Sequence, residues 1–421
     1  MSIRKRVWKT GKGDVRTAWV LDYFDQNRKR RLRTFDRKQD AEKFEATTRI
    51  EIGKGIHIAD RDSITVQQAG EMWLDECRAE NLETLTIQQY EQHLRLHIVP
   101  FIGSEKLSHL NVPFVSSFRT KLRDEGRSPA MVRGVMGSLG ALISVAQQRG
   151  HAAHNPVREL KRSRRKGNAS HQRHKPKLRT GIDIPTRDEI RALLAKAEGR
   201  WRPFLMTAVV TGLRASELRG LRWEDVDLDT KKAEVHVRQR ADRLGIIGPP
   251  KSASGYRSIP LPPDTAQLLR EWKLICPRKK EHKKDSGKLW LVFPNGAGNV
   301  EMTGNIIKRG LIPTMIAAKL VVPALDENNK LKRDAEGKPI FEPKYTGLHA
   351  LRHFFASWCI NRKVDGGHEL PPKIVQERLG HSTIAMTLDI YGHLFPRGDD
   401  TAELAAAEQS LFEAHAEKSR P

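Results

Sequence analysis

A tyrosine follows a histidine closely in the stretch Leu379-Gly-His-Ser-Thr-Ile-Ala-Met-Thr-Leu-Asp-Ile-Tyr391. The chain has only five tyrosines. A phenol has a pKa of about 10 and is a weak nucleophile unless positive charge surrounds it. If Tyr391 is reactive, the fold must bring arginine, lysine and histidine to it. Two upstream stretches could supply them, Thr211-Gly-Leu-Arg-Ala-Ser-Glu-Leu218 and Leu348-His-Ala-Leu-Arg-His353.

Attack of a tyrosine on a DNA phosphodiester is one reaction that these groups could perform. Its transition state carries extra negative charge on the nonbridging phosphate oxygens. Many nucleases neutralise this charge with a metal ion, but the sequence offers no carboxylate cluster that would hold one. Two arginines can replace the metal, because a guanidinium binds phosphate with two hydrogen bonds and keeps its charge. Arg214 and Arg352 are the candidates.

In combination, these stretches resemble the tyrosine recombinase (phage integrase) family. Its signature is an Arg in a T-G-L-R-x-S-E-L box, a Lys on a β-hairpin, an H-x-L-R box, an L-G-H box and a Tyr shortly after it. All five occur here in that order, as Arg214, Lys251, His349 with Arg352, His381 and Tyr391. Each motif alone has an ordinary interpretation, such as a packing tyrosine or a solvated helical ion pair. Their order over half the chain is what favours the family.

The histidines have separate expected roles. His349 and Arg352 are three residues apart in a predicted helix, so both should face the same side. His349 would accept or share the tyrosine proton or hold the phosphate, and His381 would donate to a nonbridging oxygen. His353 is adjacent to Arg352 and should point elsewhere, so we leave it out of the predicted site.

Lys251 and Glu217 complete the expected machinery. The 5′-oxygen of DNA leaves poorly unless it is protonated, and a lysine near other cations has a lowered pKa and can act as a general acid. Without the motif order, Lys251 would be read as an ordinary surface lysine in a turn. Glu217 would orient Arg214 without taking part in the chemistry.

The resemblance implies a covalent 3′-phosphotyrosine intermediate with Tyr391 as nucleophile. Resealing then needs no ATP, and we expect no cofactor and no metal. Attack by the 5′-hydroxyl of a second duplex would exchange strands, which implies a homotetramer on double-stranded DNA at attachment sites. An excisionase and a DNA-bending host protein are further partners that the resemblance implies.

Composition agrees with a DNA partner. The 421 residues carry a formal charge of +24, and such a field calls for a polyanion. An acidic membrane surface is the runner-up, but the sequence has no basic amphipathic helix joined to an apolar anchor. The N-terminus has no apolar signal region. The three widely spaced cysteines indicate neither a disulfide framework nor a zinc site. We expect a soluble, cytoplasmic, nucleoid-associated protein.

The predicted fold is α+β and multidomain. Residues 1–58 read as a small β-sheet plus one helix capped from Asp36, an arm-type DNA-binding domain by resemblance, or else a basic hairpin that only aids solubility. Residues 64–155 read as a helical core-binding (SAM-like) domain with a break over residues 100–103, and Asn111 and Ser128 as N-caps. Residues 156–182 form a mobile basic linker, in which 158–179 carry ten Lys or Arg and one acid.

Residues 183–396 are predicted to be a mainly α-helical catalytic domain with a small antiparallel sheet. Thr186 to Glu189 is a capping box, 201–210 a buried helix, and 233–238 and the residues after Gly255 are strands. Residues 311–344 read as irregular, with a surface insertion. The tail, 397–421, would pack on a neighbouring subunit, fold back on its own chain or fray.

Four functions are compatible with these motifs. The first is a site-specific recombinase that integrates or excises a mobile element such as a prophage. The alternatives are a type IB topoisomerase-like relaxing enzyme, a chromosome-dimer-resolving recombinase, and a DNA-binding protein that no longer cuts. The arm-like domain and the basic hinge favour the first, and the intact set of reactive residues argues against the last.

Overall fold

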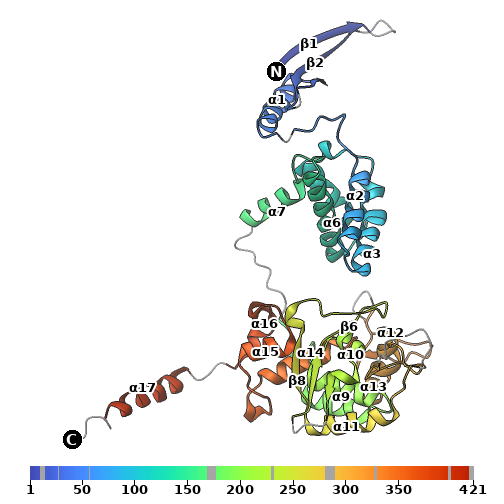
Figure 1. The fold of residues 1–421 in the computed structure, drawn as a ribbon, viewed down its shortest axis with the longest axis vertical. Coiled ribbons are helices and arrows are strands. Elements are labelled where there is room, and N and C mark those ends of the chain that lie inside the picture. The colour runs from blue at the N-terminus through green and yellow to red at the C-terminus, as the bar shows by residue number, and fades with distance from the viewer. Residues whose placement is uncertain are drawn as a thin grey trace. The chain divides into compact units, whose positions relative to one another are not determined.

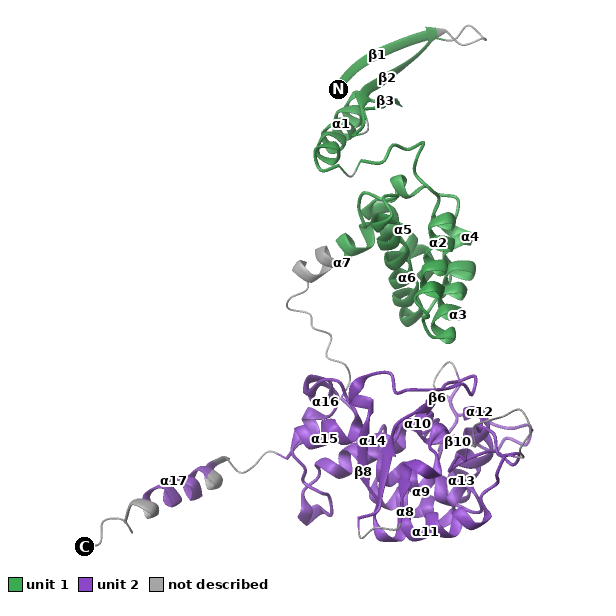
Figure 2. Cartoon of the chain, in the orientation of Figure 1, with its two compact units in different colours: residues 1–173 green, residues 174–421 purple. Residues whose placement is uncertain are grey.

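The computed structural model describes residues 1–9, 15–26, 28–55, 57–167, 177–228, 232–279, 290–326, 330–396 and 400–416. The chain divides into two compact units, residues 1–173 and 174–421 (Figures 1 and 2). The division falls inside the predicted linker, of which residues 168–176 lie outside the described residues. The boundaries of the five predicted segments stay a prediction.

Unit 1 begins with a three-stranded antiparallel sheet, ordered β1-β2-β3, and one helix. The elements are β1 (Ser2–Lys9), β2 (Val15–Phe24), β3 (Arg30–Phe35) and α1 (Lys38–Gly53). Apolar residues of β2, such as Leu21 and Tyr23, are buried. The predicted sheet and helix are therefore confirmed. The predicted cap is wrong, because the N-cap is Arg37 and its side chain caps nothing.

A helical bundle makes up the rest of unit 1. Its elements are α2 (Val66–Ala79), α3 (Thr84–His93), the π-turn η1 (Leu94–Ile98), α4 (Val99–Ile102), the 3-10 turn η2 (Leu107–His109), α5 (Val112–Asp124) and α6 (Pro129–Gln148). Asn111 and Ser128 cap α5 and α6 as predicted, accepting from the amides of Phe114 and Met131. Helix α6 alone among the described helices is long and apolar enough to span a membrane, but half of it is buried in the protein.

One prediction for the bundle is confirmed and one is wrong. The break expected over residues 100–103 occurs at the end of that stretch, because the chain passes through the π-turn η1 into α4 and the helical path ends at Gly103. Helix α7 (Pro156–Gly167) occupies the start of the predicted linker. It begins there because Val157 is buried against Gly140 of α6. Apolar anchoring at the start of a basic segment was enough to order its first turns.

Unit 2 is mainly helical, with short strands between the helices. In chain order its elements include α8 (Arg187–Lys196), α9 (Trp201–Thr211), α10 (Ala215–Gly220), β4 (Val226–Asp227), β5 (Glu234–Val237), β6 (Arg240–Ala241), β7 (Ile247–Gly248), β8 (Arg257–Pro260), α11 (Pro263–Ile275), α13 (Ile312–Ala317), α14 (His349–Ile360), α15 (Pro372–Leu379), α16 (Ile384–Tyr391) and α17 (Asp400–Ala416). Strands β4, β5 and β8 form the predicted small antiparallel sheet. The capping box from Thr186 to Glu189 is also confirmed.

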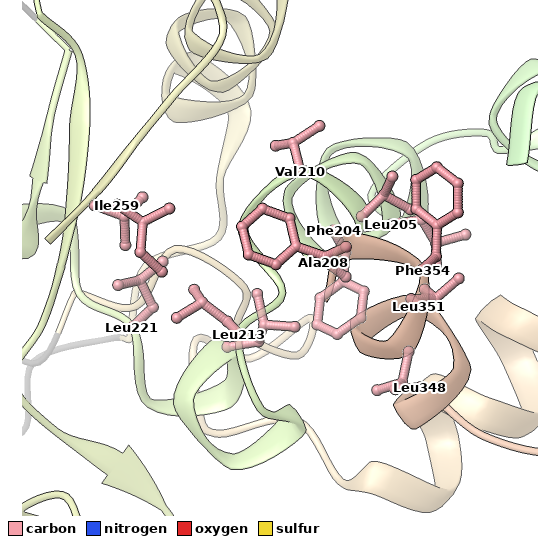
Figure 3. Packing of buried hydrophobic residues seen from close by; sticks show 14 of the residues in the cluster. Phe204, Leu205, Ala208, Val210, Leu213, Leu221, Ile259, Leu348, Leu351 and Phe354 are labelled. Carbon is pink, nitrogen blue, oxygen red and sulfur yellow. The ribbon is translucent and has the colours of Figure 1, made fainter. Parts of the chain in front are cut away.

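The core of unit 2 is built on the contact between α9 and α14. Phe204, Leu205 and Ala208 of α9 face Leu351 and Phe354 of α14 (Figure 3). Eight of the 11 residues of α9 are buried, which matches its mainly apolar sequence. This contact fixes the helix that carries the H-x-L-R box against the helix that leads into the T-G-L-R box.

The region predicted to be irregular, 311–344, is only partly so. It starts with α13 and contains a two-stranded sheet, β9 (Val321–Pro323) with β10 (Phe341–Pro343). Ala324 after β9 is buried, but residues 330–340 before β10 are exposed, in agreement with a surface insertion. The helical spacing of the tail corresponds to α17. Whether α17 packs on a neighbouring subunit stays a prediction.

Candidate active site

Local backbone geometry sets up the first arginine. Helix α9 ends at Gly212, which adopts a left-handed conformation with φ +58°. A Cβ at this position would lie 2.3 Å from the ring of Phe355 on α14, so only glycine lets the two helices approach this closely. Arg214 follows as the N-cap of α10, and its amide donates to the Glu217 carboxylate at 2.8 Å. The turn thereby aims Arg214 toward α14.

The L-G-H turn is shaped in a similar way. Helix α15 ends at Gly380, again left-handed with φ +62°, and Thr383 caps α16 by accepting from the amide of Met386. His381 therefore lies in the short connection between two helices, and Tyr391 closes the second of them. The turn positions both residues on the side of α15 and α16 that packs toward α14.

The two arginines converge on this turn. Arg214 donates to the carbonyl of Gly380 at 3.0 Å, and Arg352 donates to that of Leu379 at 2.5 Å. Arg352 also donates to the carbonyl of Gly212 at 2.7 Å, so it joins both left-handed turns. Its side chain is 3% exposed. Burial, with repulsion from Arg214, lowers the pKa of Arg352 to about 9, and the guanidinium stays charged at neutral pH.

A third arginine, Arg257, belongs to the same cluster and was missed from the sequence. It leaves β8 and pairs with Glu217 through Nη2 at 2.7 Å and Nη1 at 3.2 Å, and its Nε donates to the carbonyl of Arg378 at 2.8 Å. Burial raises the pKa of Glu217, but the hydrogen bond and charge of Arg257, together with Arg214, lower it to about 2. Glu217 is thus fully ionised, as its predicted orienting role requires.

The cluster carries more positive than negative charge. Arg214, Arg257 and Arg352 are held within one hydrogen-bonded network that contains a single carboxylate, Glu217. Buried charges of one sign are costly unless a partner neutralises them. Arg214 keeps 37% of its side chain exposed, so it is the arginine that an incoming anion can reach. The electrostatics of the cluster suit a phosphate.

Tyr391 lies beside this cluster and is 1% exposed. Burial raises the pKa of its phenol to about 12, although the charge of Arg352 acts in the opposite direction. The ring of His381 stacks on that of Tyr391, with planes 4° apart and centroids 6.5 Å apart. His381 Nδ1 is within 2.9 Å of the Thr387 hydroxyl, which fixes the ring. Burial, followed by the charges of nearby arginines, lowers the pKa of His381 to about 4.

The prediction that His353 points away from the site is wrong. Its Nδ1 lies 2.7 Å from the Tyr391 hydroxyl, and no local pattern in the sequence indicates this hydrogen bond. His349, the expected partner of the tyrosine proton, instead contacts the ring of His353 edge-on, with centroids 4.8 Å apart. Desolvation and then the charges of Arg352 and Arg214 lower the pKa of His349.

Lys251, unlike these buried groups, is exposed. It occupies an exposed bend after β7, just before the 3-10 turn Ala253–Gly255 that leads into β8. This agrees with the turn expected from the sequence. Strands β7 and β8 belong to different sheets, and the connection between them carries Lys251 and leads to Arg257 at the start of β8. The backbone therefore links the position of Lys251 to the arginine cluster.

Comparison with known proteins places this geometry in a family. Residues 185–397 match the model of the phage integrase family, and residues 65–123 match that of the phage integrase N-terminal SAM-like domain. The chain is 25% identical over 360 residues to a XerC-like tyrosine recombinase of Caldanaerobacter subterraneus, covering 82% of this chain and 83% of that protein. It is 25% identical over 334 residues to the prophage integrase IntR of Escherichia coli, covering 74% and 72%.

The fold is also similar to a solved structure. The Tn1549 transposon integrase, in complex with a circular intermediate DNA, aligns with a TM-score of 0.58 and 21% identity over 82% of this chain and 99% of that one. This likeness concerns the fold alone. Because the family model covers the whole segment from α8 past Tyr391, the chain belongs to the phage integrase family of tyrosine recombinases, enzymes that cut and rejoin DNA.

Proposed function

We propose that the protein is a site-specific integrase that inserts or excises a mobile element through a 3′-phosphotyrosine intermediate. The observation that carries the proposal is the Tyr391 hydroxyl lying beside a cluster of arginines whose charge exceeds that of Glu217. The prophage and transposon origins of the similar proteins support the mobile-element role.

In the proposed reaction, Arg214 and Arg352 hold the nonbridging oxygens of the scissile phosphate. The Tyr391 oxygen attacks phosphorus as the bond to the 5′-oxygen breaks, and Lys251 supplies the proton that this leaving oxygen needs. His381, whose Nδ1 is held by the Thr387 hydroxyl, donates to a nonbridging oxygen from Nε2. His349 helps to hold the phosphate.

The free protein does not present Tyr391 to solvent. Engagement of DNA must therefore open a path to the phenol, through a movement of α16 small enough to keep the Tyr391 hydroxyl within reach of His353. The outer face of α16 supports this, since Ile384, Met386 and Leu388 are each more than 40% exposed and add little to its attachment. We propose that DNA binding and exposure of Tyr391 are coupled.

The other parts of the chain fit the same function. We propose that residues 1–58 bind arm-type DNA, that 64–155 grip the core site, and that four protomers assemble on two duplexes. The three-stranded sheet with its basic strand β3 supports an integrase over a relaxing enzyme, which needs no second DNA-binding module. An excisionase and a DNA-bending host protein are proposed further partners. Because its substrate would be chromosomal DNA, we propose that the enzyme acts at the nucleoid, in the cytoplasm.

A covalent-trapping experiment tests the proposal. The purified protein is incubated in EDTA with supercoiled plasmid carrying the DNA that flanks its own gene, beside Tyr391→Phe. We expect a protein–DNA band that survives SDS in the wild type and disappears in the variant. Recombinant junctions between two such plasmids would distinguish an integrase from a relaxing enzyme. A band that persists in Tyr391→Phe would show that the nucleophile is another residue.

A further inference from the structure

We propose that His353 takes the proton from the Tyr391 hydroxyl during DNA cleavage and returns it during rejoining. The proposal rests on the proposed function, because it supplies the proton path for that reaction. Its basis is direct contact with the reacting atom: His353 Nδ1 lies 2.7 Å from the hydroxyl oxygen. The two rings meet at 63° with centroids 5.7 Å apart, which points a nitrogen of one ring at the hydroxyl of the other.

The two other histidines of the site are less suited to this step. The ring of His381 lies parallel to that of Tyr391, and its Nδ1 is engaged by Thr387. His349 presents its ring to His353 rather than to the phenol, as the near-perpendicular contact of 89° shows. Among the described side chains, His353 is the one that the structure places in hydrogen-bond contact with the phenol.

The surroundings of His353 explain why the proton does not move in the free protein. The titratable groups that face it are His349 and Arg352 on its own helix α14, Asp183 from the segment before α8, and Tyr391 on α16. Burial, followed by the charges of His349 and Arg352, lowers the pKa of His353 to about 4, whereas that of Tyr391 is raised to about 12. The phenol therefore keeps its proton.

A bound phosphodiester changes this balance. Its negative charge would lie against Arg352, the residue next to His353, and would offset the repulsion that disfavours a histidine cation there. As the Tyr391 oxygen bonds to phosphorus, its proton passes to His353 Nδ1, the bond from phosphorus to the 5′-oxygen breaks, and Lys251 gives that leaving oxygen a proton. In rejoining, the 5′-hydroxyl gives its proton to Lys251 as it attacks phosphorus, and the His353 cation returns the other proton to the departing tyrosine oxygen. No reactant beyond the protein and the DNA is needed.

The decisive variant is His353→Asn. An asparagine amide places a hydrogen-bonding atom close to where Nδ1 lies, but it cannot take up a proton, so it separates catalysis from mere positioning. We measure the single-turnover rate of covalent complex formation on the plasmid described above, from pH 6.5 to 9, for the wild type and the variant. The ratio of the two rates cancels ionisations that both proteins share.

We expect His353→Asn to lower the rate at pH 7 by roughly 10²- to 10⁴-fold, the usual contribution of a general base. The deficit should shrink by about tenfold per pH unit, because without a base the reaction depends on the phenolate, whose population rises tenfold per unit. His349→Gln serves as the matched comparison: its rate should fall through weaker phosphate binding, but its ratio to the wild type should not change with pH.

The outcomes separate the two proposals. If His353→Asn forms the covalent band at the wild-type rate, or if its rate deficit does not change with pH, the role of His353 is overturned and the proposed function stays intact. A wild-type protein that forms no covalent band overturns the proposed function, and the role of His353 with it. Restoration of the rate in His353→Asn by a fluorinated, more acidic tyrosine at position 391 would support the proton transfer independently.

Discussion

Replacing Arg257 by methionine removes one of the two guanidinium groups that neutralise Glu217. Glu217 is 4% exposed, and Arg257 binds both of its oxygens from a side chain that is 5% exposed. Loss of one partner of a buried ion pair typically costs about 3–5 kcal/mol. The pKa of Glu217 supports the same order of magnitude: burial raises it, but Arg257 and then Arg214 lower it from 4.5 to about 2, a net stabilisation of the carboxylate by about 3 kcal/mol at 1.36 kcal/mol per unit.

Both values predict that Arg257→Met lowers the free energy of unfolding of unit 2 by about 3 kcal/mol or more. The same substitution at Arg214, whose side chain is 37% exposed, should cost about 1 kcal/mol or less in stability. Arg214→Met should nevertheless abolish covalent complex formation. Glu217 thus pairs with one arginine, Arg257, that mainly stabilises the fold and with another, Arg214, that mainly serves catalysis. Arg257→Met should therefore have the larger effect on stability.

The assay is urea unfolding of the full chain, followed by tryptophan fluorescence, because five of the eight tryptophans lie in unit 2. Arg191→Met is the control, since Arg191 pairs with Asp188 on an exposed helical surface and should change stability by about 0.5 kcal/mol at most. A loss below 1 kcal/mol for Arg257→Met would refute the reasoning from buried charge. An equal loss for Arg214→Met would refute the division of roles.

Three further predictions concern other parts of the chain. Gly212→Ala should destabilise unit 2 by about 1–3 kcal/mol, measured by the same unfolding assay, because alanine is strained at φ +58° and its Cβ would overlap α14. Tetranitromethane, which attacks phenolates, should nitrate the exposed Tyr256 before the buried Tyr391 in the free protein, and peptide mapping would reveal the reverse order if Tyr391 is in fact accessible. The ion pair of Glu51 with His154 should stabilise unit 1 most between about pH 4.5 and 6.5. The pKa of Glu51 is lowered to about 2, so its contribution to stability is lost as the pH falls toward 2. The pKa of His154 is raised, so its contribution is lost as the pH rises through the folded-state pKa. Thermal unfolding of wild type and His154→Ala across this range should differ most inside the window, and a constant difference would contradict the linkage.

The sequence by itself determined the family, the helices that carry the motifs and the chemical character of the site. Arg214, His349, Arg352, His381 and Tyr391 could be chosen because their local spacing is fixed by short motifs. Capping signals and apolar periodicity are also local, so the starts of several helices and the buried nature of α9 followed from them.

Only the tertiary structure decided which of these groups touch. Helical spacing places His353 away from Arg352, but it says nothing about what packs on the other side of α14; in the fold, α16 lies there and delivers Tyr391 to His353. Arg257 has no local signal either, since its partners Glu217 and Arg378 are 40 and 121 residues away. The start of α7 likewise depended on a small gap beside Gly140 that Val157 fills. Contacts between distant segments depend on how side chains fill space, and a pattern read along one segment does not contain that information.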